Sequence, residues 1–102
     1  MHADRIFDAL ASAARRRMLG LLAQGERTTS ELAARFGVSA PAVSRHLSVL
    51  ESAGLVASRR EGQRVLYALV RDTLMEALSA LATELSTPAP APPRAKPRRE
   101  AI

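Results

Sequence analysis

The chain has 102 residues, a formal net charge of +5, no cysteine, no tryptophan and three aromatic residues, Phe7, Phe36 and Tyr67. This length supports a single small domain. The absence of cysteine excludes a disulfide scaffold, a thiolate metal site, a thiol redox sensor and a cysteine nucleophile. The positive charge points to a polyanionic partner, although its location along the chain matters more than its size.

Much of the charge lies in the last residues, 88–102, which hold five of the six prolines. Four basic side chains occur there against one acidic residue: Arg94, Lys96, Arg98 and Arg99 against Glu100. A Pro-rich segment without apolar periodicity cannot bury enough surface to order itself. We therefore divide the chain into a folded domain, 1–87, and a disordered tail, 88–102. The tail is either a solubilising extension or a non-specific phosphate contact.

Apolar spacing predicts two short helices at the N-terminus. The first covers residues 4–11 and carries Ile6, Phe7 and Leu10 on one face. Ser12 is placed to cap the second helix, which ends near Gly25. No signal-peptide pattern and no long apolar run is present, so we expect a cytoplasmic protein without a membrane partner.

The next two helices are separated by the short break Gly37-Val38-Ser39. Thr28 and Glu31 have the spacing of a capping box, which starts a helix over about 29–36. After the break, Ser39 caps a helix that has Pro41 in its first turn and runs to about Ser52. Its buried stripe is Val43, Leu47 and Leu50, and Gly54 is placed to end it in a left-handed conformation.

The β-rich runs 55–60 and 64–70, joined by the loop Glu61-Gly62-Gln63, predict a hairpin. A last helix begins at Asp72 and stops before Pro88. The predicted fold is mostly α with a small β-hairpin, in the order α-α-α-α-β-β-α. Two short helices across a tight glycine turn, followed by a hairpin, form a winged helix-turn-helix.

The run SELAARFGVSAPAVSRHLSVLESAGLVASRREGQRVLYAL, from Ser30 to Leu69, resembles the winged-helix repressors of the ArsR family. The earlier ASAARRRMLGLL matches the helix that precedes this motif, so the resemblance covers roughly residues 4–86. It implies a bacterial homodimer whose first and last helices form the interface. It also implies that the fourth helix enters the major groove of double-stranded DNA.

The resemblance also indicates which sensing devices are missing. Metal-sensing members carry a Cys-x-Cys type pair in the third helix, where this chain has Ser30-Glu31-Leu32-Ala33. A second family metal site uses Asp and His on the last helix, which here offers Asp72, Glu76 and Glu84 but no histidine. Carboxylates alone are poor ligands for a transition metal, so we expect no metal and no cofactor. The effector is not predicted.

The outward face of the fourth helix supplies the candidate base contacts. Arg45 is the only long donor there, and a guanidinium can pair bidentately with guanine. Its alternative role is a solvated surface charge. The other residues are small and read bases through few contacts, thymine methyls and DNA shape. The predicted base-contact set is Ala40, Pro41, Ser44, Arg45 and Ser48.

Candidate phosphate contacts lie at helix starts and on the hairpin, the wing of the motif. Hydroxyls at helix N-termini suit phosphate, although simple capping is the alternative. The hairpin holds the densest positive charge of the folded body and is otherwise a solvated loop. His46 has a structural or phosphate-facing role in preference to a catalytic one. The set is Thr28, Thr29, Ser39, His46, Arg59, Arg60, Gln63 and Arg64.

Two further predictions concern charge and assembly. Arg15, Arg16 and Arg17 fall in the first turn of a helix, where cations oppose the dipole, so they need an anionic neighbour. That neighbour is either Asp8 or an acidic residue of a partner, with a DNA phosphate as the alternative. The leucine stripe of the last helix is shared between core and dimer seam, with pure intrachain packing as the alternative. The predicted interface is Ile6, Phe7, Leu10, Leu74, Leu78, Leu81 and Leu85.

These patterns favour a sequence-specific, dimeric, DNA-binding transcription regulator, a repressor, on a palindromic operator. The alternative is a winged-helix module that binds a protein partner without specific DNA binding. RNA binding is disfavoured because stacking platforms need exposed aromatic residues. We expect no enzyme, because the sequence shows neither paired carboxylates on one face nor a phosphate loop.

Overall fold

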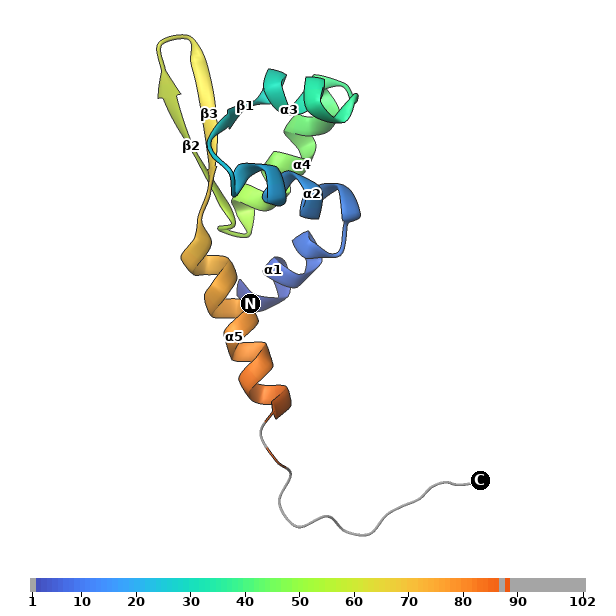
Figure 1. Ribbon diagram of the computed structural model, residues 1–102, viewed down its shortest axis with the longest axis vertical. Coiled ribbons are helices and arrows are strands. Elements are labelled where there is room, and N and C mark those ends of the chain that lie inside the picture. The colour runs from blue at the N-terminus through green and yellow to red at the C-terminus, as the bar shows by residue number, and fades with distance from the viewer. Residues whose placement is uncertain (1, 87, 89–102) are drawn as a thin grey trace, which may run out of the picture.

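The computed structural model describes residues 2–86 and 88 (Figure 1). The elements in chain order are α1 (His2–Leu10), α2 (Ala13–Leu22), β1 (Arg27–Thr28), α3 (Thr29–Phe36), α4 (Ala40–Ser52), β2 (Val56–Glu61), β3 (Arg64–Leu69) and α5 (Arg71–Ser86). The predicted fold class is therefore confirmed, with one strand, β1, that the sequence did not predict. Except for Pro88, the predicted tail lies outside the described residues.

The strands form an antiparallel sheet in the order β1-β3-β2. Glu61 pairs with Arg64 across the hairpin, so the turn is Gly62-Gln63 and the predicted loop was one residue too long. Gly62 has φ +63°, the left-handed conformation that two-residue hairpin turns favour. Strand β1 was missed because a pair of residues is too short to show alternation.

Side-chain caps fix where the helices begin, as predicted. Ser12 Oγ accepts the Arg15 amide at 3.2 Å and Ser39 Oγ accepts the Ala42 amide at 3.2 Å. The capping box of α3 is complete: Thr28 Oγ1 accepts the Glu31 amide at 3.1 Å, and Glu31 Oε1 accepts the Thr28 amide at 2.8 Å. The last helix begins at Arg71, one residue earlier than predicted.

Arginines cap the C-terminal end of α1, which corrects the expected pairing with the Asp8 side chain. Arg15 Nε donates to the carbonyl of Ala9 at 2.8 Å, and Arg16 Nη1 donates to that of Leu10 at 2.6 Å. Asp8 offers Arg15 its backbone carbonyl and not its carboxylate, with Arg15 Nη2 3.2 Å away. The anionic neighbour is thus the negative C-terminal end of α1. These hydrogen bonds fix the α1–α2 corner.

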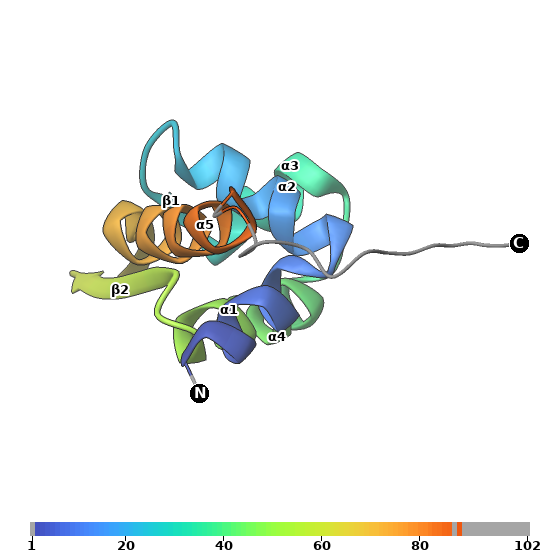
Figure 2. The ribbon, with the colours of Figure 1, turned by 90° about the horizontal axis from the view of Figure 1, so that it is seen from below.

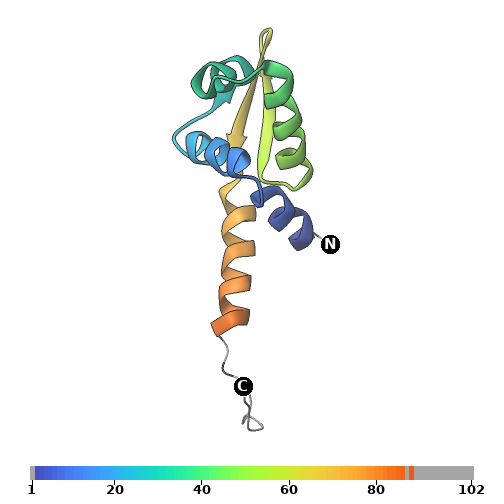
Figure 3. The same ribbon diagram turned by 90° about the vertical axis from the view of Figure 1, so that its right-hand side faces the viewer.

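The core lies between the helices and the sheet. The predicted stripe of α4, Val43, Leu47 and Leu50, is fully buried. It packs with residues from α2, α3 and the segment just before β2, the largest of which are Met18, Leu32 and Leu55. Burying each such side chain contributes about 1.5–3 kcal/mol to folding. Helix α5 has no fully buried residue and extends away from this core (Figures 1 and 3).

Candidate nucleic-acid interface

The elements of the predicted DNA site lie at one end of the molecule. The hairpin tip, α3 and the start of α4 gather there, whereas α1 and α5 lie toward the opposite end (Figures 1 and 3). Figure 2, seen from that opposite end, looks along α5. The fold therefore separates the candidate nucleic-acid surface from the candidate dimer surface.

The predicted base-contact residues share one exposed face of α4. Ala40, Pro41, Ser44, Arg45 and Ser48 are all exposed. Arg45 makes no hydrogen bond or ion pair within the part of the chain that the structure describes. Its guanidinium is thus available for an outside partner. Ala42, next to Pro41, is half-buried instead, because its flank of α4 turns toward α2 and α3.

The hydroxyls at the helix starts serve as caps. Thr28 and Ser39 each use an oxygen lone pair for an amide of their own helix, which leaves the hydroxyl hydrogen for another acceptor. Thr29 is half-buried at the first position of α3. The hydrogen bond from the Thr28 amide, the largest cause, lowers the pKa of Glu31. The capping box is therefore charged at neutral pH.

The structure divides the predicted wing arginines into two kinds. Arg59 holds Glu26 with two donors, Nη2 to Oε1 at 2.7 Å and Nε to Oε2 at 3.0 Å. This contact lowers the pKa of Glu26 and raises that of Arg59. Arg60 makes no such contact among the described residues, and Arg64 lies only at 3.7 Å from Glu61. Gln63 is exposed in the turn.

Glu26 is the residue that sequence reasoning missed. It lies in the connection after α2, 33 residues before Arg59, and no local pattern marks a pair so far apart in the chain. Its two carboxylate oxygens hold the wing strand β2 against that connection. Because of this pair, Arg59 is less available to a phosphate than Arg60.

His46 lies on the flank of α4 that faces α2. It is half-buried, and its Nδ1 is 3.4 Å from Arg15 Nη1. This position favours the structural role over the phosphate-facing one. The imidazole joins α4 to the arginine that caps α1.

The predicted dimer residues fall into three groups that differ in exposure. Ile6 is only 5% exposed and belongs to the core of its own chain, so its assignment to the interface was wrong. Phe7, Leu10 and Leu74 are half-buried, and Leu10 and Leu74 pack against the core. The outer part of α5 exposes Leu78, Leu81 and Leu85 together with Met75, which the sequence analysis did not include.

Within residues 2–86 and 88, no three His, Cys, Asp or Glu side chains gather in a way that could hold a metal ion. None of the helices in this part of the chain has the length and apolar character to cross a membrane.

Comparison with known proteins agrees with this architecture. A family model described as bacterial regulatory protein, arsR family, matches residues 12–58. The transcriptional repressor SdpR of Bacillus subtilis is 32% identical over 76 residues, which are 74% of this chain and 84% of SdpR. The chain belongs to the ArsR family.

Further relatives place this ArsR-family protein among transcription regulators. The regulator Rv2034 of Mycobacterium tuberculosis is 47% identical over 66 residues, 65% of this chain and 62% of Rv2034. A probable mercury resistance operon repressor of Streptomyces lividans is 42% identical over 65 residues, 64% of this chain and 52% of that relative. The chain thus spans only about half to two thirds of these two relatives.

Solved structures show the same fold. The ArsR family transcriptional regulator RHA00566 has a TM-score of 0.74 at 32% identity, over 82% of this chain and 86% of that one. The homodimeric winged helix-turn-helix DNA-binding domain of Mb0332 from Mycobacterium bovis has a TM-score of 0.70 at 35% identity, over 84% of this chain and 82% of that one. The ArsR-family protein described here is a winged helix-turn-helix transcription regulator.

Proposed function

We propose that this ArsR-family protein is a homodimeric, cytoplasmic transcriptional repressor that binds a palindromic operator through α4 and the hairpin. The proposal rests on the exposed face of α4, where Arg45 lies among small side chains and makes no hydrogen bond or ion pair with any residue that the structure describes. The names of SdpR and of the Mb0332 domain support repression and a dimer for those relatives.

Base reading follows from the shape of that face. Ala40, Pro41, Ser44 and Ser48 are small, so the backbone of α4 can come close to the base edges in the major groove. Arg45 then offers two parallel donors to O6 and N7 of one guanine, worth about 1–3 kcal/mol of discrimination. Because few side chains read bases directly, DNA shape supplies part of the specificity.

The hairpin contributes more to the overall affinity for DNA than to recognition of its base sequence. Arg60 and Arg64 carry positive charge near the tip: Arg60 has no ion pair with any described residue, and Arg64 has only a long one, 3.7 Å from Glu61. Such side chains suit backbone phosphates or the neighbouring minor groove. The hydroxyl hydrogens of Thr28 and Ser39 add phosphate contacts at the starts of α3 and α4.

Selection of bound sequences from random duplexes tests the proposal. We expect a palindrome whose half-sites lie about 10–10.5 base pairs apart, or a multiple of that. A two-fold symmetric dimer binds two half-sites that are related by the same symmetry. Recovery of asymmetric or unrelated sequences would contradict a palindromic operator. Failure to retain any duplex would favour a protein-binding module instead.

A pair of substitutions with the same charge change tests the division of labour. Arg45→Gln should relax the preference at one position of each half-site by about 1–3 kcal/mol. Arg60→Gln, the matched control, should weaken all duplexes by a similar factor and leave the selected sequence unchanged. Competition binding with the selected operator and single-base variants measures both. An unchanged preference in Arg45→Gln would remove Arg45 from base reading.

A further inference from the structure

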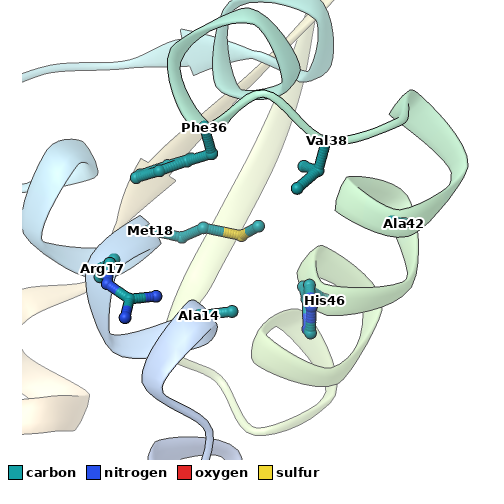
Figure 4. Close-up of a pocket in the computed structure, with 7 residues that line it drawn as sticks. All are labelled: Ala14, Arg17, Met18, Phe36, Val38, Ala42 and His46. Carbon is teal, nitrogen blue, oxygen red and sulfur yellow. The ribbon is translucent and has the colours of Figure 1, made fainter.

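A cavity of about 140 Å³ lies between α2, α3 and α4 (Figure 4). Its lining residues are Ala14, Arg17, Met18, Phe36, Val38, Ala42 and His46. An apolar cavity of about 150 Å³ in a protein interior is large enough to hold benzene. The space between these three helices therefore fits a ligand with an aromatic ring or a short aliphatic chain.

The two ends of this cavity differ in chemistry. Phe36, Val38 and Met18 meet at one end, whereas the side chains of Arg17 and His46 lie at the other (Figure 4). Val38 is a large apolar residue, but it is 44% exposed because the core does not cover its side chain. One end thus suits an apolar group and the other an anion.

Arg17 supplies the charge at the polar end. Its neighbours Arg15 and Arg16 are occupied by the carbonyls at the end of α1, but Arg17 has no hydrogen bond or ion pair with any residue that the structure describes. A guanidinium free of protein partners can hold a carboxylate with two parallel hydrogen bonds. His46 uses Nδ1 toward Arg15, which leaves its other ring nitrogen for a ligand.

We propose that this cavity is a binding site for a small organic carboxylate with a hydrophobic body of about six carbon atoms. The carboxylate pairs with Arg17, and the hydrophobic body lies against Met18, Phe36 and Val38. A ligand in this place touches α2 and both helices of the DNA-binding motif at once. It therefore changes how firmly α4 is held against α2, and with it the affinity for DNA, an effect that rests on the proposed function.

Benzoate is a suitable probe, and benzamide is its neutral counterpart. The full chain is titrated with benzoate, and the amide chemical shifts are followed in NMR spectra. We expect benzoate to shift the signals of residues on α2, α3 and α4. Arg17→Gln should lower the affinity for benzoate by about tenfold, because hydrogen bonds to a charged group are lost, and should leave the affinity for benzamide unchanged. Arg16→Gln removes the same charge one residue away and should leave benzoate binding unchanged.

A second variant tests the cavity itself. Ala14→Leu adds a side chain from α2 into the space and should abolish the shifts caused by both probes, while an unchanged melting curve shows that the fold is kept. The proposal is overturned if benzoate moves no signals around the cavity, if benzoate and benzamide bind equally, or if Ala14→Leu retains full binding. It is also overturned if Arg17→Gln lowers DNA affinity and leaves benzoate binding unchanged, because Arg17 is then a phosphate contact.

Operator affinity measured with and without benzoate distinguishes ligand binding from DNA binding. Operator affinity measured without the probe tests DNA binding alone. Operator affinity with saturating benzoate should change, and the operator should change benzoate affinity by the same factor, since coupling is reciprocal. Binding of benzoate with unchanged operator affinity would overturn the coupling and leave the DNA-binding function standing.

Discussion

Single arginine residues have different roles that depend on what each one contacts. Arg15 and Arg16 hold the end of α1, Arg59 holds Glu26, and Arg45 and Arg60 make no hydrogen bond or ion pair with any described side chain. The exposure of Arg45 could be predicted, because the buried positions of α4 repeat at helical spacing around it. The pairing of Arg59 could not, because it depends on a residue brought close only by the folded chain.

The salt dependence of DNA binding tests this difference between arginines. Arg60→Ala should lower the slope of log affinity against log salt by about one unit, since one phosphate contact is lost. Arg59→Ala should lower this slope by less, because Glu26 already neutralises the Arg59 guanidinium. Glu26→Gln should raise the affinity for every duplex by freeing Arg59. Equal slopes for the two alanine variants would contradict the assignment.

Helices and strands show which local signals are reliable. The starts of α2, α3 and α4 could be predicted because a serine or threonine cap acts within three residues. The hairpin was predicted by its two β-rich runs and the glycine between them, although its turn is one residue shorter. Strand β1 depends on pairing with Tyr67 and Leu66 of β3, a long-range contact that local propensity does not encode.

The capping box of α3 gives a stability prediction. Thr28→Ala should lower the free energy of unfolding by about 1 kcal/mol, because the Glu31 amide loses its acceptor. The nearby exposed Ser30→Ala should have a much smaller effect. Urea denaturation followed by circular dichroism measures both. A loss for Ser30→Ala as large as for Thr28→Ala would show that the cap is not the cause.

The same box contributes a pH dependence. The pKa of Glu31 is lowered in the folded chain, so its contribution is present above the ordinary carboxyl pKa and is lost as pH falls through the lowered value. Glu31→Gln should therefore show a weaker loss of stability under acid than the unchanged protein. Urea midpoints compared between neutral and acid pH measure this difference. Parallel curves for the two proteins would contradict it.

The whole molecule has a nucleic-acid end and an assembly end. The apolar residues of α1 and α5 were recognisable in the sequence, but apolar spacing alone cannot tell burial in the same chain from burial against a partner. Ile6 proved to be a core residue, whereas Leu78, Leu81 and Leu85 are left exposed. An exposed leucine stripe on a helix that extends from the core is typical of an interface between chains.

A substitution on α5 tests that surface. Leu78→Glu should dissociate the dimer and leave each chain folded, since α5 contributes no fully buried residue. Ser79→Glu places the same charge on another face of the helix and should leave the dimer intact. Sedimentation velocity gives the mass, and circular dichroism reports the fold. A Leu78→Glu protein that remains dimeric would place the interface elsewhere.

Sedimentation of the protein with the selected operator shows whether a symmetric dimer reads a palindrome with α4. We expect two chains on each intact duplex and a large loss of affinity when one half-site is scrambled, because both α4 helices must engage. One chain per duplex, or equal affinity for the intact and half-scrambled duplexes, would contradict it.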